Sequence, residues 1–222
     1  MGTTRPRLDG VSGEIPTRGV TVMVGPSGSG KSTLLRLCNR LDIADEGWVR
    51  FRGDDVTTLD PLALRRRVGM VFQRPTPFPG TVRENLLVAE PSLEDRDAAR
   101  AVERVGLEDS FLSRDARELS GGEAQRVCLA RTLVTGPEVV LMDEVTSSVD
   151  TAARRGLEDL ATALAASGVS IVWVTHDLHQ MRRLADHAVV VIDGRIGHCG
   201  SPATLDAEAP PAVRRFLAGE AP

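Results

Sequence analysis

The sequence predicts an α/β fold built on a mostly parallel sheet. Short runs rich in β-branched residues alternate with longer helical patterns in both halves of the chain, and one such run leads into a glycine-rich loop that opens a helix. Between the two alternating regions, from about residue 81 to residue 136, the pattern is almost purely helical. We therefore expect one domain over residues 1–222, with a helical subdomain at about 75–136.

The expected elements follow in order along the chain. The first half contains predicted strands at 20–25, 48–53 and 68–72 and a helix from Lys31 to about Leu41. The second half contains predicted strands at 138–143, 169–176 and 187–194, a helix at about 151–167, a short helix before the last strand and another near the C-terminus. In the helical segment, Ser92 and Ser120 are candidate N-caps, because a serine side chain can accept a hydrogen bond from the first turn.

Composition and charge argue against several classes of protein. The net charge is -4, so the chain lacks the basic surface of a general nucleic-acid binder, and we expect no nucleic-acid partner. The three cysteines, Cys38, Cys128 and Cys199, lie far apart, which favours a reducing compartment over a disulfide framework or a zinc site. No apolar run reaches the roughly 20 residues that span a bilayer, and no signal peptide is recognisable, so we expect a cytoplasmic location.

The stretch GPSGSGKST follows the first predicted strand and opens the first helix. It matches the pattern GxxxxGK[ST] in the setting where that pattern binds phosphate. Glycines let successive backbone N–H groups converge on phosphate oxygens, and the helix N-terminus adds its positive dipole. Lys31 would face the β- and γ-phosphates, and the Ser32 hydroxyl would ligate Mg²⁺. The residues expected to bind the nucleotide here are Gly25, Pro26, Ser27, Gly28, Ser29, Gly30, Lys31, Ser32 and Thr33.

An acidic pair follows a buried strand pattern in VVLMDE. The strand would deliver Asp143 and Glu144 to its carboxyl end, the edge where ligands bind in open α/β sheets. We expect Asp143 to hold Mg²⁺ and Glu144 to polarise the attacking water. An acidic pair after a strand is common in solvated turns, so it becomes informative only together with the phosphate loop.

A second candidate anion site lies in LSGGEAQRV, where Ser120, Gly121 and Gly122 begin a helix. Read alone, the segment is an ordinary capped helix. One nucleotide hardly needs two such sites from a single chain. We therefore expect a head-to-tail dimer in which each ATP lies between the glycine-rich loop of one copy and the SGG segment of the other.

These segments resemble the motifs of ATP-binding subunits of ABC transporters, and the resemblance covers essentially the whole chain. GPSGSGKST is similar to the Walker A motif, LSGGEAQRV to the signature sequence and VVLMDE to Walker B. Gln73 in VFQRP matches the Q-loop glutamine, Asp150 ends a segment that resembles the D-loop, and His176 in WVTHD matches the switch histidine. The resemblance implies a P-loop NTPase core with an antiparallel β region and an inserted helical subdomain.

The resemblance also implies roles for these residues. Gln73 would contact Mg²⁺ and the attacking water, and His176 would contact the γ-phosphate. With Lys31 and Glu144 they form the expected catalytic set, while Ser32, Gln73 and Asp143 form the metal set. Asp150, with the SGG segment of the second copy, completes the nucleotide site. The expected cofactors are ATP and Mg²⁺.

Two classes of ABC ATPase remain open. In the first, the chain energises a separate integral-membrane permease and lies at the inner face of the cell membrane. In the second, it is a soluble ATPase of iron-sulfur cluster assembly. The segment RRRVGMVFQRPTPFPGTVRENL is similar to phosphate-import subunits, whereas DEVTSSVD and VWVTHD resemble subunits of iron or metal efflux. We favour transport of phosphate or another small inorganic ion. The apolar residues Phe78, Val82 and Leu86 are expected to be exposed and to receive a short helix of the permease.

Overall fold

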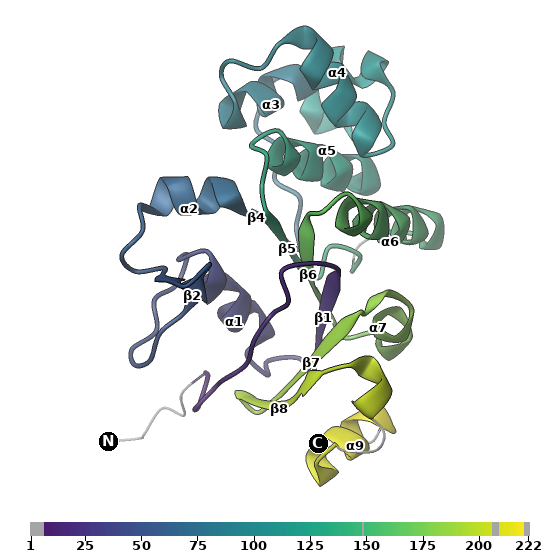
Figure 1. Cartoon of the computed structure of the whole chain (residues 1–222). Helices are drawn as coiled ribbons and strands as arrows, with labels where there is room; N and C mark the ends of the chain where they lie inside the picture. Colours follow the sequence, from purple (N-terminus) through teal and green to yellow (C-terminus); the bar gives the residue numbers. More distant parts are fainter. Residues whose placement is uncertain (1–6, 148, 206–208, 220–222) are drawn as a thin grey trace, which may run out of the picture.

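The computed structural model describes residues 7–147, 149–205 and 209–219, which form a sheet with helices on both faces (Figure 1). Five strands are parallel and lie in the order β4 (Val68–Val71), β5 (Val139–Asp143), β6 (Ser170–Thr175), β1 (Val20–Val24) and β7 (His187–Ile192). The last strand, β8 (Arg195–Gly200), pairs antiparallel with β7 at the edge. The mostly parallel α/β sheet is confirmed.

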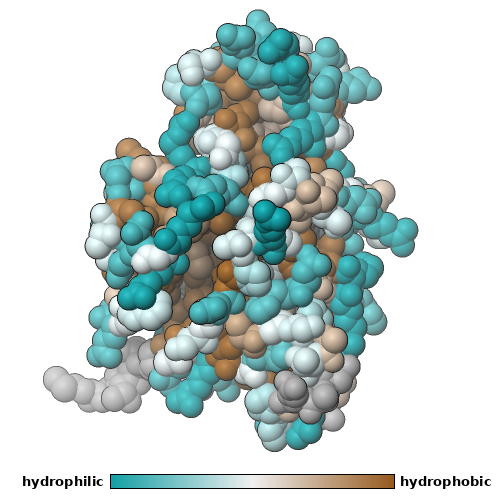
Figure 2. Space-filling model, in the orientation of Figure 1, coloured by the Kyte–Doolittle hydropathy of each residue, from teal (hydrophilic) through white to brown (hydrophobic). Residues whose placement is uncertain are grey.

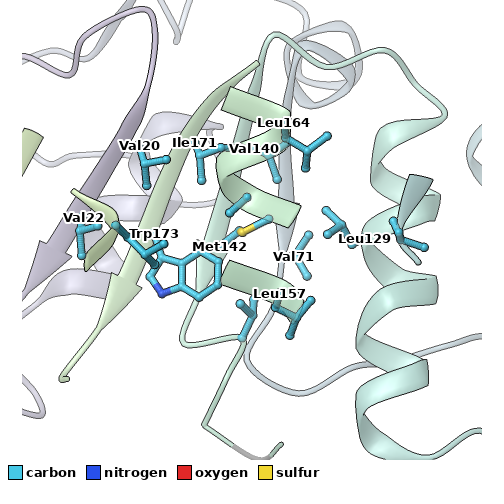
Figure 3. Packing of buried hydrophobic residues seen from close by; sticks show 14 of the residues in the cluster. Val20, Val22, Val71, Leu129, Val140, Met142, Leu157, Leu164, Ile171 and Trp173 are labelled. Carbon is cyan, nitrogen blue, oxygen red and sulfur yellow. The ribbon is translucent and has the colours of Figure 1, made fainter. Parts of the chain in front are cut away.

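The parallel strands are buried on both faces, so their apolar residues alternate between two separate hydrophobic clusters. Val22 and Val24 of β1 belong to one cluster, while Met23 between them belongs to the other. The larger cluster packs β5 and β6 against helices on one face, with Trp173 fully buried near its centre (Figure 3). This double burial explains why the strands read as continuous apolar runs.

Two groups of helices cover the sheet. One face carries α1 (Lys31–Cys38), α2 (Pro61–Arg67) and the hairpin of β2 (Arg50–Phe51) and β3 (Asp54–Asp55). The other face carries α5 (Gly121–Leu133), α6 (Thr151–Ala166), α7 (Leu178–Leu184) and α9 (Pro211–Leu217). A short 3₁₀ turn, η3 (Pro202–Thr204), precedes α9. Within the described ranges, every helix is too short or too polar to cross a bilayer.

The chain between β4 and β5 is helical apart from an isolated bridge, as its pattern indicates. After α2 and β4 it forms α3 (Val82–Ala89), α4 (Asp95–Arg104), η1 (Asp109–Ser113) and η2 (Ala116–Glu118), and it then enters α5. Buried residues of α3 and α4 belong to the same hydrophobic cluster as the face of the sheet. The helices are therefore built onto the sheet, at the top of Figure 1.

Several local expectations were wrong. Ser92 does not cap α4, because Glu94 occupies the N-cap position and the Ser92 hydroxyl donates to Glu90 instead. Acidic side chains in the first turn, Asp95 and Asp97, favour this start by their interaction with the helix dipole. The strand predicted at 48–53 is only the two-residue β2.

Local sequence patterns also mark the turn of the β2–β3 hairpin and the start of α2. Arg52 and Gly53 have φ values of 53° and 92° between β2 and β3, as a two-residue hairpin turn requires. Asp60 caps α2 by accepting from the Ala63 N–H, and Pro61 is its first residue. Both patterns cover only a few residues, and neither adjoins a long periodic run of apolar residues.

Candidate active site

Four adjacent strands deliver the predicted site residues to one edge of the sheet. The glycine-rich loop follows β1, Asp143 and Glu144 lie at the end of β5, and His176 follows β6. Gln73 lies two residues beyond the end of β4. Because these strands are parallel, their carboxyl ends meet at the same edge, where open α/β sheets bind ligands.

The glycine-rich loop, residues 25–30, has the shape of a phosphate-binding cradle. A Cβ atom at Gly25 would collide with the Val191 carbonyl oxygen, so only glycine fits there. Gly28 has a φ of 76° and open space where a side chain would point, which leaves its backbone accessible. The Ser29 hydroxyl is buried without a hydrogen-bond partner among the described residues. The loop therefore offers polar groups to an anion at the start of α1.

Lys31 is folded into this loop. Its Nζ donates to the carbonyl oxygens of Gly25 at 2.9 Å and of Pro26 at 2.8 Å. Burial lowers the pKa of Lys31 from its usual value, although the negative charges of Glu144 and Asp143 oppose this shift. A buried ammonium held by neutral carbonyls is well placed to accept an anionic partner, such as a nucleotide phosphate.

Ser32 and Asp143 bring a hydroxyl and a carboxylate together, although they are far apart in the sequence. The Ser32 hydroxyl donates to Asp143 Oδ1 over 2.8 Å. Burial raises the pKa of the Asp143 carboxyl, and a cation beside it would favour its ionised form. Hard oxygen donors of this kind fit Mg²⁺. The expected metal residues Ser32 and Asp143 are therefore compatible with the ion.

Glu144 lies close to two other predicted catalytic groups, Gln73 and His176. Its Oε2 lies 3.5 Å from His176 Nδ1 and accepts a long hydrogen bond of 3.4 Å from Gln73 Nε2. Glu144 has a φ of 47°, an uncommon conformation for a residue with a side chain, and its N–H donates to the Val174 carbonyl of β6. Backbone strain of this kind persists where the surroundings over-determine it, often at functional sites.

The SGG segment does not join this cluster within one chain. Ser120 caps α5 in a reciprocal pair with Glu123, whose carboxylate accepts from the Ser120 N–H over 2.8 Å. The pKa of Glu123 is lowered first by hydrogen bonding with the Ser120 side chain and then by the bond from the Ser120 N–H. Gly121 and Gly122 follow in α5, which packs against α3, α4 and β4, whereas α1 packs against β5. Figure 1 accordingly shows α5 and α1 well apart.

Asp150 acts as a helix cap in this structure. Its carboxylate accepts from the N–H groups of Ala152 and Ala153, at 2.9 Å each, and begins α6. The residue is solvent-exposed. Like the SGG segment, Asp150 forms no hydrogen bond with Lys31 or Ser32 within the described part of the chain.

Two buried amide side chains lie near the site, and no sequence pattern predicted their roles. Gln180 of α7 and Glu144 both line a small cavity of about 50 Å³. Gln125 of α5 donates to the Phe72 carbonyl oxygen over 3.0 Å, next to Gln73. Both amides act through contacts between distant parts of the chain, which no local pattern reveals.

Comparison with known proteins identifies related sequences. A family model described as ABC transporter matches residues 8–147. ABC transporter I family member 17 of Arabidopsis thaliana is 41% identical over 215 residues, which cover 95% of this chain and 82% of that protein. Phosphate import ATP-binding protein PstB 3 of Natronomonas pharaonis is 42% identical over 202 residues, which cover 84% of this chain and 73% of that protein.

Solved structures agree with these sequence relatives. The cbiO1 protein of Clostridium perfringens, described as part of the ABC transporter complex cbiONQ, superposes with a TM-score of 0.79 at 27% identity, over 91% of this chain and 84% of that one. The ATP-binding cassette MJ0796, in a dimeric post-hydrolysis state with ADP and Pi, superposes with a TM-score of 0.78 at 29% identity, over 90% of this chain and 93% of that one. The chain therefore belongs to the ABC transporter family, as one of its ATP-hydrolysing, energy-coupling subunits.

Proposed function

We propose that this subunit couples ATP hydrolysis to the import of phosphate, or of another small inorganic ion, through a separate membrane permease. The observation that carries the coupling role is an exposed hydrophobic surface beside the loop of Gln73. The phosphate assignment is supported by the name of the N. pharaonis relative and by the similarity of residues 65–86 to phosphate-import subunits. Binding to the permease would hold the chain at the inner face of the cell membrane.

The hydrophobic surface, which we call the coupling surface, consists of Leu62, Phe72, Phe78 and Val88, all exposed. These residues come from α2, the segment after β4, and α3. Arg66 of α2 joins these elements, because it donates to the Ala89 carbonyl and forms an ion pair with Glu90 at the end of α3. Figure 2 shows hydrophobic residues exposed among largely hydrophilic neighbours on the face of the molecule that it draws. Exposed apolar groups gathered in one region are typical of protein-binding surfaces.

The prediction that Val82 and Leu86 of α3 are exposed on this surface is wrong. Val82 and Leu86 are fully buried, and Val88 is exposed instead. Val82 and Leu86 are four residues apart, so they share the helix face that joins the core. Val88 lies on the opposite face. Only the packing direction of α3 decides which face meets solvent.

Phe78 is held in a preformed loop. The buried Asn85 amide accepts from the Phe78 N–H over 2.7 Å and donates to the Phe78 carbonyl over 2.9 Å. The Arg131 guanidinium lies over the Phe78 ring, 4.5 Å from its centroid. A loop fixed in this way loses little conformational freedom when a partner binds, which favours its use as a docking point.

We expect Phe78→Asp to uncouple the chain from its permease. The basal ATP hydrolysis of the isolated chain stays within about twofold, because Phe78 lies outside the nucleotide site, while ATP-driven transport falls at least about tenfold, because the change removes the apolar ring from the interface and puts a polar charged group in its place. Ile43→Asp is the matched control, since Ile43 is also exposed but lies outside the coupling surface. Normal transport by Phe78→Asp would remove this surface from the permease interface.

At the nucleotide site, we assign the β- and γ-phosphates of ATP to the loop of residues 25–30, Lys31 and Thr33. Ser32, Asp143 and Gln73 would hold Mg²⁺, which neutralises charge on the phosphate oxygens. Glu144 would polarise the attacking water, with His176 beside the γ-phosphate. Because Ser120, Gly121, Gly122 and Asp150 do not reach Lys31 in one chain, a second copy in head-to-tail orientation would supply them.

Identifying the partner tests the proposal as a whole. The tagged chain is extracted gently from membranes, the integral-membrane subunit that accompanies it is identified, and both are reconstituted in vesicles. We expect ATP-dependent movement of labelled phosphate into or out of the lumen, according to the orientation of the permease. Movement of a different ion would contradict the phosphate assignment. Recovery of iron-sulfur assembly proteins in place of a permease would contradict transport.

A further inference from the structure

A buried amide lies behind the two loops that carry Glu144 and His176. Gln180, the third residue of α7, is 1% exposed. Its Oε1 accepts from the Trp173 indole N–H over 3.1 Å. Its Nε2 donates to Glu158 Oε1 over 2.8 Å and to Thr146 Oγ1 over 3.3 Å. An indole N–H can only donate and an ionised carboxylate can only accept, so the partners determine the orientation of the amide.

The partners of Gln180 lie close to the proposed catalytic groups along the chain. Thr146 is two residues after Glu144, and Trp173 is three residues before His176. Both partners are buried, which leaves their polar groups few alternatives to this amide. The side chain of Gln180 therefore links the segment after β5, which carries Glu144 and Thr146, to Trp173 of β6, the strand that leads to His176.

Two further contacts hold the amide in place. Glu158 of α6 is itself bound by Arg183 of α7, whose Nη2 donates to both carboxylate oxygens, at 2.8 and 3.0 Å. Asp177, directly after His176, caps α7 by accepting from the Gln180 N–H over 3.1 Å. The backbone and the side chain of Gln180 are thus both anchored next to His176.

We propose that Gln180 is a positioning residue for ATP hydrolysis, which holds the Glu144 and His176 loops at the separation that the reaction needs. The inference rests on the roles proposed above for Glu144 and His176. Their side chains lie 3.5 Å apart across a contact between two loops, with Glu144 in an uncommon backbone conformation. A fully bonded buried amide that spans both loops supplies the constraint that such a geometry requires.

Replacing the amide by an apolar group of similar shape tests this role. We expect Gln180→Met to lower kcat about tenfold with KM for ATP within about twofold, because small displacements of reacting groups slow the chemical step without removing contacts to substrate. Thr146→Val, which removes only one acceptor, lowers kcat about threefold, and the double variant is no worse than Gln180→Met because both changes break the same link.

Gln180→Glu provides a conservative variant with its own readout. When protonated, the introduced carboxyl group can accept from Trp173 and donate to Glu158; when ionised, it loses the donor and repels Glu158. We expect its kcat, relative to the parent, to recover as the pH falls from about 8 to about 6, since burial raises the pKa of the introduced group. The charged and titratable groups that surround this position are Glu144, Arg154, Glu158, His176, Asp177 and Arg183.

ATP hydrolysis is measured under conditions in which circular dichroism shows each variant to be folded. Trp48→Phe leaves Trp173 as the single tryptophan, so a change in its emission in Gln180→Met reports loss of the indole hydrogen bond. A folded Gln180→Met with parental kcat overturns the inference, and if that variant does not fold, parental kcat in Thr146→Val overturns it. Glu144→Gln is assayed in parallel. If it hydrolyses ATP normally, the proposed site itself fails, which is distinguishable from failure of the positioning role alone.

Discussion

Glu144→Gln is expected to lower the rate of ATP hydrolysis at least about a hundredfold, the loss typical when a general base is removed. Glutamine keeps the size of the side chain but cannot take up a proton from water. The contacts of Lys31 with the loop of residues 25–30 and of Ser32 with Asp143 do not involve the Glu144 carboxylate. ATP binding is therefore preserved, and phosphate release and nucleotide affinity measured on the same sample separate the two effects.

The same variant is expected to accumulate a dimer that holds ATP between its two copies, because hydrolysis would open the closed state. Light scattering with Mg-ATP gives the mass directly. Glu46→Gln is the control, since Glu46 is exposed and lies outside the strand-end cluster. Hydrolysis at the parental rate in Glu144→Gln would rule out Glu144 as the group that activates water.

Ser120→Arg is expected to abolish ATP-dependent dimerisation and turnover while the monomer still binds ATP. Ser120 lies at the start of α5, apart from α1 and the phosphate loop of its own chain, so a bulky charge there leaves that loop intact. In a head-to-tail dimer, the same charge would occupy the space required by the nucleotide of the second copy. Lys31→Ala gives the complementary result, because it weakens ATP binding itself and so prevents dimer formation.

Two controls separate this effect from a loss of helix stability. Ser120→Ala removes the N-cap, which costs about 1 kcal/mol, but adds neither bulk nor charge. Ser110→Arg places the same charge on an exposed position of the same helical segment. Mass and phosphate release are measured for all variants. Dimerisation and turnover by Ser120→Arg at the parental level would contradict a nucleotide site shared between two copies.

The sequence by itself determined the class of fold and the edge of the sheet where the site lies. Each glycine-rich, acidic or histidine motif directly follows an apolar run, and such runs become parallel strands whose carboxyl ends meet. The grouping of Lys31, Asp143, Glu144 and His176 was therefore predictable without knowing the order of the strands. The N-cap at Ser120 was also predictable, because a capping box involves residues only three apart in the sequence.

Only the tertiary structure decided which surfaces and which buried polar groups serve that site. Val82 and Leu86 turn inward and Val88 outward because α3 packs one face onto the core, a direction that its short apolar pattern leaves open. Gln180 finds Trp173, Thr146 and Glu158 on three different elements. Local sequence patterns reflect interactions between residues that are close along the chain. Burial and buried hydrogen bonds depend instead on which elements meet in space, and these contacts form only when the whole chain packs.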